Sequence, residues 1–177
     1  MKVALFVTCL VDQLCPNVGM ATVEVLERAG CTVTFDDRQT CCGQPAFNTG
    51  YRDEARDFAK KFIEIFEDSD ADAIVSPSGS CTAMVKHFRE VFPDEPEWRA
   101  RADRIAAKTH ELSSFLVNVL GVDDVGAVAS GKATWHDACH GLRDLRIKDE
   151  PRRLLQKVEG LEFVEMENAD VCCGFGG

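Results

Sequence analysis

Residues 2–9, K-V-A-L-F-V-T-C, place a compact apolar run directly before a cysteine. A short apolar run of this kind is typical of a buried strand. Asp12 follows too soon for a signal peptide or a membrane span, which needs about 20 apolar residues. The first half of the chain then alternates strand-like and helix-like segments, the pattern of a parallel sheet covered by helices. We expect strands at residues 2–8, 31–35 and 73–75, and helices at 20–29, 51–68 and 80–92.

The apolar spacing of the helical segments indicates which side chains face inward. On the first helix these are Met20, Val23 and Leu26. After a break at residues 93–97, a long helix is expected over 98–120, followed by a Gly-rich turn at 121–131. The pattern then restarts, with a strand at 133–136, a helix at 150–158 and a strand at 161–165.

This restart is a sequence repeat. Cys9 is followed after 31 residues by Cys41-Cys42-Gly43, and Cys139 after 32 residues by Cys172-Cys173-Gly174. In both halves the lone cysteine follows a strand, and the CCG follows the next strand. We therefore predict an α/β fold of two pseudo-repeated halves, each with a parallel β-sheet flanked by helices. The first CCG repeat spans 1–95, a linking helix and turn spans 96–131, and an incomplete, truncated second repeat spans 132–177.

The cysteines are predicted to converge, because the carboxyl ends of parallel strands meet at one edge, where such folds bind ligands. Cysteines of the first half follow its three strands, and the second half repeats the arrangement without a fourth cysteine. The predicted site residues are Cys9, Cys41, Cys42 and Cys81, and Cys139, Cys172 and Cys173.

Adjacent cysteines restrict what these sites can hold. Neighbouring Cα atoms lie ~3.8 Å apart, below the ~4.4–6.8 Å usual for a disulfide, so a vicinal bridge would be strained. Structural zinc usually draws on cysteines two to four residues apart. Neighbouring thiolates suit a polynuclear centre better, because each can bind a different iron. An iron–sulfur cluster is favoured, and the strained disulfide and zinc remain alternatives.

Other residues near the predicted sites have several interpretations. Gly43, Gly174, Gly176 and Gly177 would let the backbone approach a cluster and donate N–H groups to its sulfurs, or would merely turn the chain. Cys31 opens a strand and is interpreted as a buried apolar residue. Cys15 is an alternative ligand. His140 is either functional or structural, and His136 lies on the other side of Cys139.

Composition excludes several classes of function. The net charge of −10 argues against a nucleic-acid partner. Nine cysteines without an export signal indicate a reducing cytoplasm, and no membrane insertion is expected. No G-x-G-x-x-G follows a strand, so hydride chemistry on a flavin or nicotinamide is expected elsewhere. The sequence identifies no catalytic residue.

The segments Cys41–Ala46 (CCGQPA), Pro77–Cys81 (PSGSC) and 172–177 (CCGFGG) resemble the CCG-domain iron–sulfur oxidoreductases. The resemblance runs along the whole chain. It implies a cytoplasmic iron–sulfur subunit, carrying [4Fe-4S] centres on the seven cysteines above, that transfers electrons with other subunits of a lactate utilization complex oxidising L-lactate to pyruvate.

Two departures from the family pattern affect the sites. Ser78-x-x-Cys81 stands where heterodisulfide reductase relatives have C-x-x-C, and the last cysteine of the second repeat is not in this sequence. We therefore expect the second site, with three thiolates, to be weak or empty. The alternatives to electron transfer are a thiol–disulfide or heterodisulfide reductase and a zinc-binding structural protein.

Overall fold

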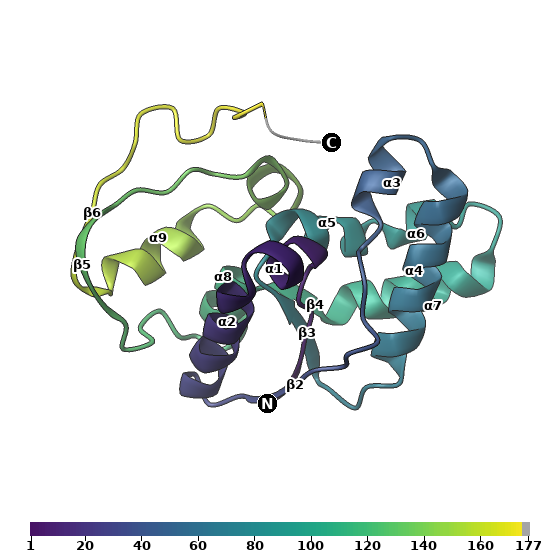
Figure 1. The fold of residues 1–177 in the computed structure, drawn as a ribbon, viewed down its shortest axis with the longest axis horizontal. Helices are drawn as coiled ribbons and strands as arrows, with labels where there is room; N and C mark the ends of the chain where they lie inside the picture. The colour runs from purple at the N-terminus through teal and green to yellow at the C-terminus, as the bar shows by residue number, and fades with distance from the viewer. Residues whose placement is uncertain (175–177) are drawn as a thin grey trace.

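A computed structural model describes residues 1–174, and Figure 1 shows its α/β arrangement. The strands are β1 (Lys2–Leu5), β2 (Thr32–Thr34), β3 (Ala73–Ser76), β4 (Thr109–Glu111), β5 (Val128–Ala133) and β6 (Glu159–Phe163). The helices are α1 (Cys9–Leu14), α2 (Pro16–Arg28), α3 (Gln44–Asn48), α4 (Arg52–Glu67), α5 (Gly79–Lys86), α6 (Phe88–Val91), α7 (Pro96–Lys108), α8 (Leu112–Ser114) and α9 (Asp149–Gln156). Two π-helical turns are η1 (Phe115–Val119) and η2 (His140–Asp144).

The main sheet is parallel, in the order β2-β1-β3-β4. Val3 of β1 lies beside Val33 of β2 on one side and Ala73 of β3 on the other. The chain therefore leaves β1 toward one edge to form β2, then crosses to the other side of β1 to form β3. The direction of the connections reverses between β1 and β3, and such a reversal opens a crevice at the carboxyl ends of the strands.

Helices cover both faces of this sheet (Figure 1). Ala4 and Ile74 pack into a core with α4, α5, α6 and α7. Their neighbours Val3 and Val75 pack on the opposite face with α2 and η1. All four residues of β3 are buried, as expected for a strand of a parallel sheet covered on both sides.

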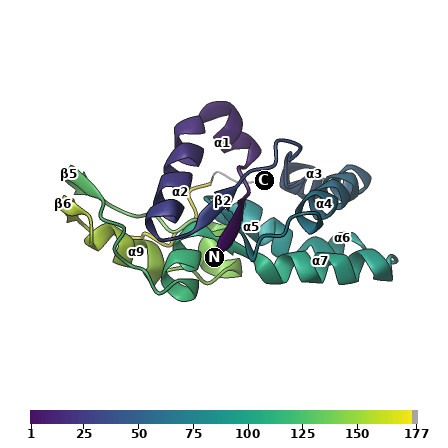
Figure 2. The ribbon, with the colours of Figure 1, turned by 90° about the horizontal axis from the view of Figure 1, so that it is seen from below.

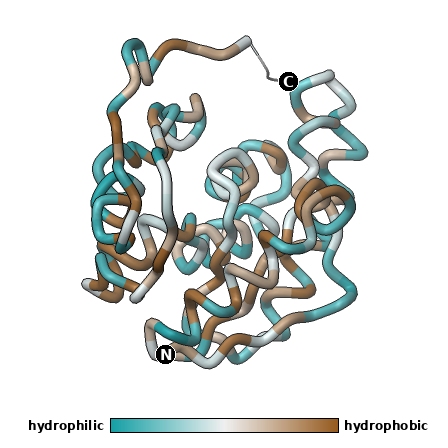
Figure 3. Tube along the Cα trace, turned by 60° about the vertical axis from the view of Figure 1, so that its left-hand side comes forward, coloured by the Kyte–Doolittle hydropathy of each residue, from teal (hydrophilic) through white to brown (hydrophobic). Residues whose placement is uncertain are grey.

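Hydrophobic residues follow the strands and the inner sides of the helices, while hydrophilic ones lie on the outer sides (Figure 3). One side of α4 is apolar and faces the core, with Ala55, Ala59, Phe62 and Phe66 buried. Phe62 contacts three other rings, with centroid distances of 4.8 Å to Phe6, 4.4 Å to Phe66 and 5.3 Å to Phe88. In residues 1–174 no helix combines the length and apolar character that crossing a bilayer requires.

The second sheet contains β5 and β6, which pair in parallel (Figures 1 and 2). Figure 2 shows the two strands at one end of the molecule, away from the main sheet. α9 connects them and packs against β6. Most residues of both strands are exposed. The expected strand at 133–136 lies earlier, at Val128–Ala133, so residues 134–138 form a loop that leads to Cys139.

Two helix predictions are wrong in extent. The chain does not form one helix over 98–120, because α7 ends at Lys108 and Thr109–Glu111 pairs with β3 as β4. This pairing satisfies the backbone groups at the β3 edge and buries Thr109 completely. The helix expected over 80–92 divides at His87 into α5 and α6.

The inward face of α2 also differs from expectation. Leu26 is buried as predicted, but Met20 is 71% exposed, and Gly19 and Thr22 are buried in place of Met20 and Val23. The helix begins at Pro16, four residues earlier than predicted. A β-carbon at Gly19 would lie 3.6 Å from Val7 and 3.7 Å from Val11, so position 19 faces these two side chains at ordinary packing distance.

The Phe62 ring cluster is expected to contribute strongly to stability. Phe62→Ala should lower the free energy of unfolding by about 3–5 kcal/mol, because it leaves a cavity between the other rings. Phe35→Ala is the matched control, since Phe35 is 57% exposed and its loss should cost less than about 0.5 kcal/mol. Urea titration followed by circular dichroism measures both. Equal losses in the two variants would contradict this account of the core.

Candidate metal centre

The first cysteine set lies at the crevice between β1 and β3. Cys9 begins α1, which follows β1, and Cys81 lies in the first turn of α5, which follows β3. Thr8 and Ser78 cap the two helices by accepting N–H bonds from Val11 and Cys81. The chain thus places both thiols at helix N-termini, where the positive end of the helix dipole favours a thiolate.

The CCG turn brings Cys41 and Cys42 to the same edge from the loop after β2. Gly43 has φ +82°, and its N–H donates to the Cys41 sulfur over 3.4 Å. A β-carbon at Gly43 would lie 2.9 Å from the Phe58 β-carbon. Gly174 repeats this conformation, with φ +79° and an N–H bond of 3.4 Å to the Cys172 sulfur. Both glycines therefore turn the chain and donate to a cysteine sulfur, while the predicted donation to the sulfurs of a cluster stays a prediction. Gly176 and Gly177 lie outside the described residues.

The four thiols of the first set are in contact. The Cys9 thiol donates to the Cys41 sulfur over 3.6 Å, and Cys42 interacts with both Cys41 and Cys81. The hydrogen bond from Cys42 lowers the pKa of Cys41 to about 5 and that of Cys81 to about 7. Hydrogen bonding to these sulfurs raises the pKa of Cys42, and burial raises that of Cys9 to about 11. Within this set, hydrogen bonding thus favours the thiolate form at Cys41 and Cys81 and the thiol form at Cys9 and Cys42.

Gln39, which the sequence interpretation missed, connects the Cys9 and Cys41 segments. Its amide oxygen accepts from the Val7 N–H over 2.8 Å. Its amide nitrogen donates to the carbonyls of Leu5 and Asp36 over 3.0 and 2.9 Å. The sequence feature that could have indicated a role for Gln39 is its position, two residues before Cys41 in a segment that follows a strand. Only the folded chain shows which backbone groups it satisfies.

The second set, Cys139, Cys172 and Cys173, is more open to solvent. Cys139 follows β5, and the exposed Cys172 and Cys173 follow β6. Cys139 interacts with the Cys172 sulfur, which raises the pKa of Cys139. The Gly174 N–H and then the Cys139 thiol lower the pKa of Cys172, and the positive charge of Arg143 adds to this effect.

The two sets are neighbours. The side-chain amide of Gln44 donates to the Ser80 carbonyl over 3.2 Å and lies 3.3 Å from Nε2 of His140. Because Nε2 then accepts, Nδ1 of His140 carries the proton and donates to Asp144. Gly79 and Gly141 pack backbone to backbone, so that a β-carbon on Gly79 would lie 3.3 Å from the Gly141 Cα. The structure thus assigns His140 a bridging contact between the halves.

Two cysteines lie apart from both sets. Cys31 is buried against the core of Val3 and Leu26, as predicted, and burial raises its pKa. Cys15 is exposed at the junction of α1 and α2. Nε2 of His136 donates to the Val171 carbonyl over 2.8 Å, because a carbonyl oxygen can only accept.

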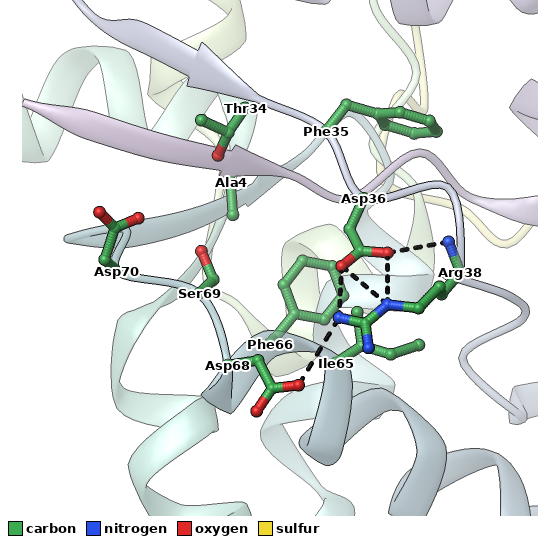
Figure 4. Close-up of a pocket in the computed structure, with 10 residues that line it drawn as sticks. All are labelled: Ala4, Thr34, Phe35, Asp36, Arg38, Ile65, Phe66, Asp68, Ser69 and Asp70. Atoms are coloured by element: carbon green, nitrogen blue, oxygen red, sulfur yellow. Dashed lines mark hydrogen bonds and ion pairs between the residues drawn. The ribbon is translucent and has the colours of Figure 1, made fainter.

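A separate cavity of about 180 Å³ lies beside β1 and β2 (Figure 4). Arg38 crosses it and pairs with Asp36 over 2.7 Å and with Asp68 over 3.6 Å. No cysteine is among the residues that line this cavity. The cavity therefore contributes no side chain to the thiol sets.

The donor set is chemically compatible with a metal or an iron–sulfur cluster. Cysteine thiolates are the usual ligands of such clusters, and the first set supplies four sulfurs from three strand ends and a glycine N–H beside them. Within residues 1–174, no three side chains of His, Cys, Asp or Glu are arranged to hold a single metal ion. The structure does not assign a cluster type.

The CCG turn is testable through Gly43. Gly43→Ala should lower the free energy of unfolding by about 2–4 kcal/mol, because it adds both left-handed strain and a clash with Phe58. Gly30→Ala is matched, since Gly30 has φ +83° but no atom within 4 Å of a β-carbon, and should cost only about 1 kcal/mol. Denaturant titration compares the two variants. A smaller loss in Gly43→Ala would contradict the close approach.

The thiolate assignment is testable in metal-free protein. Cys41 should react with iodoacetamide down to pH about 5, because its pKa lies there. Cys42→Ala removes a donor to Cys41, so the half-point of labelling should move upward. Peptide mass spectrometry follows Cys41, and Cys31→Ala serves as the control that should leave the half-point unchanged. An unchanged half-point in Cys42→Ala would contradict the network.

Comparison with known proteins gives consistent matches. The cysteine-rich domain family (CCG) matches residues 3–86 and 133–177. Lactate utilization protein A of Geobacillus kaustophilus (strain HTA426) is 56% identical over 177 residues, which cover 100% of this chain and 73% of the relative. Lactate utilization protein A of Bacillus subtilis (strain 168) is 54% identical over the same length, with 74% of the relative covered. The protein of that name from Shouchella clausii (strain KSM-K16) is 54% identical.

Proposed function

The chain belongs to the cysteine-rich CCG domain family, and we propose that it is an iron–sulfur electron-transfer subunit in the oxidation of L-lactate to pyruvate. The observation that carries this proposal is the meeting of Cys9, Cys41, Cys42 and Cys81 at the β1/β3 crevice. The name lactate utilization protein A, borne by relatives at 54–56% identity, supports the substrate.

In this proposal Cys9, Cys41, Cys42 and Cys81 bind one cluster, and Cys139, Cys172 and Cys173 supply three thiolates to a second site, which holds its cluster more weakly. A [4Fe-4S] cluster, when bound, accepts and releases single electrons. Cys41 and Cys81 are suited to metal binding because a ligand must be deprotonated and both have lowered pKa values. Cys9 and Cys42 release their protons on binding.

The surrounding residues hold these ligands. Gln39 fixes the spacing between the Cys9 and Cys41 segments through its three hydrogen bonds. The Gly43 N–H donates toward sulfur, and such bonds tune the potential of a cluster. Cys42 is 2% exposed, so the inner side of the site is shielded from water.

The contact of Gln44, two residues after Cys42, with His140, one residue after Cys139, supports electron exchange between the two sets. We propose that electrons from lactate pass through them to other subunits of a cytoplasmic lactate utilization complex. The chain shows no dinucleotide fingerprint, so the proposal assigns hydride removal from lactate to a partner subunit.

A thiol–disulfide reductase is the second candidate, and the low pKa of Cys41 favours it. The Cys41 thiolate can attack a substrate disulfide, which releases one substrate thiol and leaves a mixed disulfide. The Cys9 thiol then displaces the second substrate thiol, and a Cys9–Cys41 disulfide remains on the protein. This alternative needs no bound iron in the substrate step. A zinc-binding structural protein without redox chemistry is the third candidate function for the same cysteines.

Anaerobic purification, iron and sulfide analysis and electron paramagnetic resonance (EPR) test the proposal. The protein should contain iron and acid-labile sulfide and give an EPR signal after reduction. Cys42→Ser should abolish the signal of the first site and lactate-dependent electron transfer, because it removes a ligand. Cys31→Ser is the matched control and should retain both, since Cys31 lies in the core.

Different outcomes separate the three functions. Stoichiometric zinc with no iron would exclude electron transfer through a cluster. Disulfide reduction by iron-free protein at an undiminished rate would favour the thiol mechanism. Loss of the cluster in Cys31→Ser at unchanged stability would show that the assignment of Cys31 as a core residue, and not a ligand, is wrong.

A further inference from the structure

Arg152 of α9 forms two forked ion pairs beside the second cysteine set. Its guanidinium donates to both carboxylate oxygens of Asp137 over 2.7 and 2.9 Å. It also donates to both oxygens of Glu165 over 2.8 and 2.7 Å. The planar fork of arginine suits this double pairing, and the single charge of lysine does not reproduce it. We call Arg152, Asp137 and Glu165 the Arg152 cluster.

The Arg152 cluster joins the two segments that carry the cysteines. Asp137 lies two residues before Cys139, in the segment after β5. Glu165 lies just after β6, in the segment that leads to Cys172. One further backbone bond, from the Asp137 N–H to the Ala169 carbonyl over 2.8 Å, connects the same two segments. α9 thus reaches both cysteine loops through one side chain.

Burial makes this contact difficult to replace. The Asp137 side chain is 1% exposed and that of Arg152 is 12% exposed, whereas Glu165 is 48% exposed. A buried carboxylate without its cation is strongly unfavourable, so the Asp137 segment depends on Arg152 to keep its position. A cavity of about 410 Å³ lies beside the cluster and is lined by all three residues. Besides Arg152, the Asp137 segment is held to the Cys172 segment by the Asp137 N–H bond to the Ala169 carbonyl and by Nε2 of His136, which donates to the Val171 carbonyl.

The first half performs the same connection with a neutral group. There Gln39 joins the backbone at Val7, two residues before Cys9, to the segment before Cys41. Asp137 occupies the corresponding position two residues before Cys139. The two sets therefore have similar cysteine positions, but a side-chain amide connects the loops of the first set and a network of charged side chains connects those of the second.

We propose that Arg152 is a positioning residue that holds Cys139 and Cys172 within reach of each other. The proposal concerns the geometry of the thiols and applies with or without a bound cluster. Together with the proposed function, it makes Arg152 a determinant of cluster binding at the second set only. The first set keeps its geometry through Gln39.

Thiol cross-linking in metal-free protein tests this directly. Diamide oxidises two neighbouring thiols to a disulfide and is itself reduced to the hydrazine, and peptide mass spectrometry identifies the pairs. Arg152→Met should slow formation of the Cys139–Cys172 disulfide roughly tenfold, because small displacements have large effects on proximity-driven reactions. The Cys9–Cys41 rate, from thiols 3.6 Å apart, should not change.

Matched variants separate positioning from general loss of stability. Gln39→Leu should give the reverse result, slowing Cys9–Cys41 and sparing Cys139–Cys172. Arg152→Lys should recover only part of the Cys139–Cys172 rate. Should Arg152→Met fail to fold, Asp137→Asn, which keeps the shape and removes the buried charge, should slow the same pair at least roughly threefold.

The outcomes that overturn the inference are specific. An unchanged Cys139–Cys172 rate in folded Arg152→Met excludes the positioning role, and so does an equal loss at both thiol pairs. Iron analysis adds an independent readout, since Arg152→Met should lose iron at the second set and keep the EPR signal of the first. Absence of iron from the wild-type protein would refute the proposed function. The cross-linking rates would still test the positioning role of Arg152, because they are measured in metal-free protein.

Discussion

Parallel pairing of β1 with β2 on one side and β3 on the other is the constraint on which the site depends. All three carboxyl ends then lie at one edge, and the reversal between β1 and β3 opens space there. Cysteines separated by more than 70 residues along the chain, Cys9 and Cys81, thereby share one thiol network. An antiparallel partner at either position would carry its following loop to the opposite edge.

Crowding four thiols into this space has an electrostatic cost, because neighbouring thiolates repel one another. The structure distributes protons to limit this cost, with Cys42 acting as donor and Cys41 and Cys81 as acceptors. Helix N-termini and the Gly43 N–H add positive partial charge at the same place. Binding of a metal or cluster, with which these donors are compatible, would release the protons, because metal ligands bind in their deprotonated form.

The two halves support similar turns by different physical means. The CCG glycines have nearly the same φ and the same N–H bond to sulfur. Around them, Gln39 satisfies backbone groups in the first half, while Arg152 balances two carboxylates in the second. The contact of Gln44 with His140 and the close packing of Gly79 on Gly141 then connect the halves near their cysteines. This arrangement links the sites without a large shared core.

The sequence by itself determined the α/β class, the strand-ending positions of the cysteines and the burial of Cys31, because these depend on local apolar pattern and turn chemistry. The division into three ranges, 1–95, 96–131 and 132–177, stays a prediction, as do the ligand assignments. Only the tertiary structure decided that Thr109–Glu111 joins the sheet, since its helical spacing was overridden by pairing at the β3 edge. It also decided the long-range contacts of His140 with Gln44 and of Arg152 with Glu165, because these partners lie 96 and 13 residues away and no local pattern specifies them.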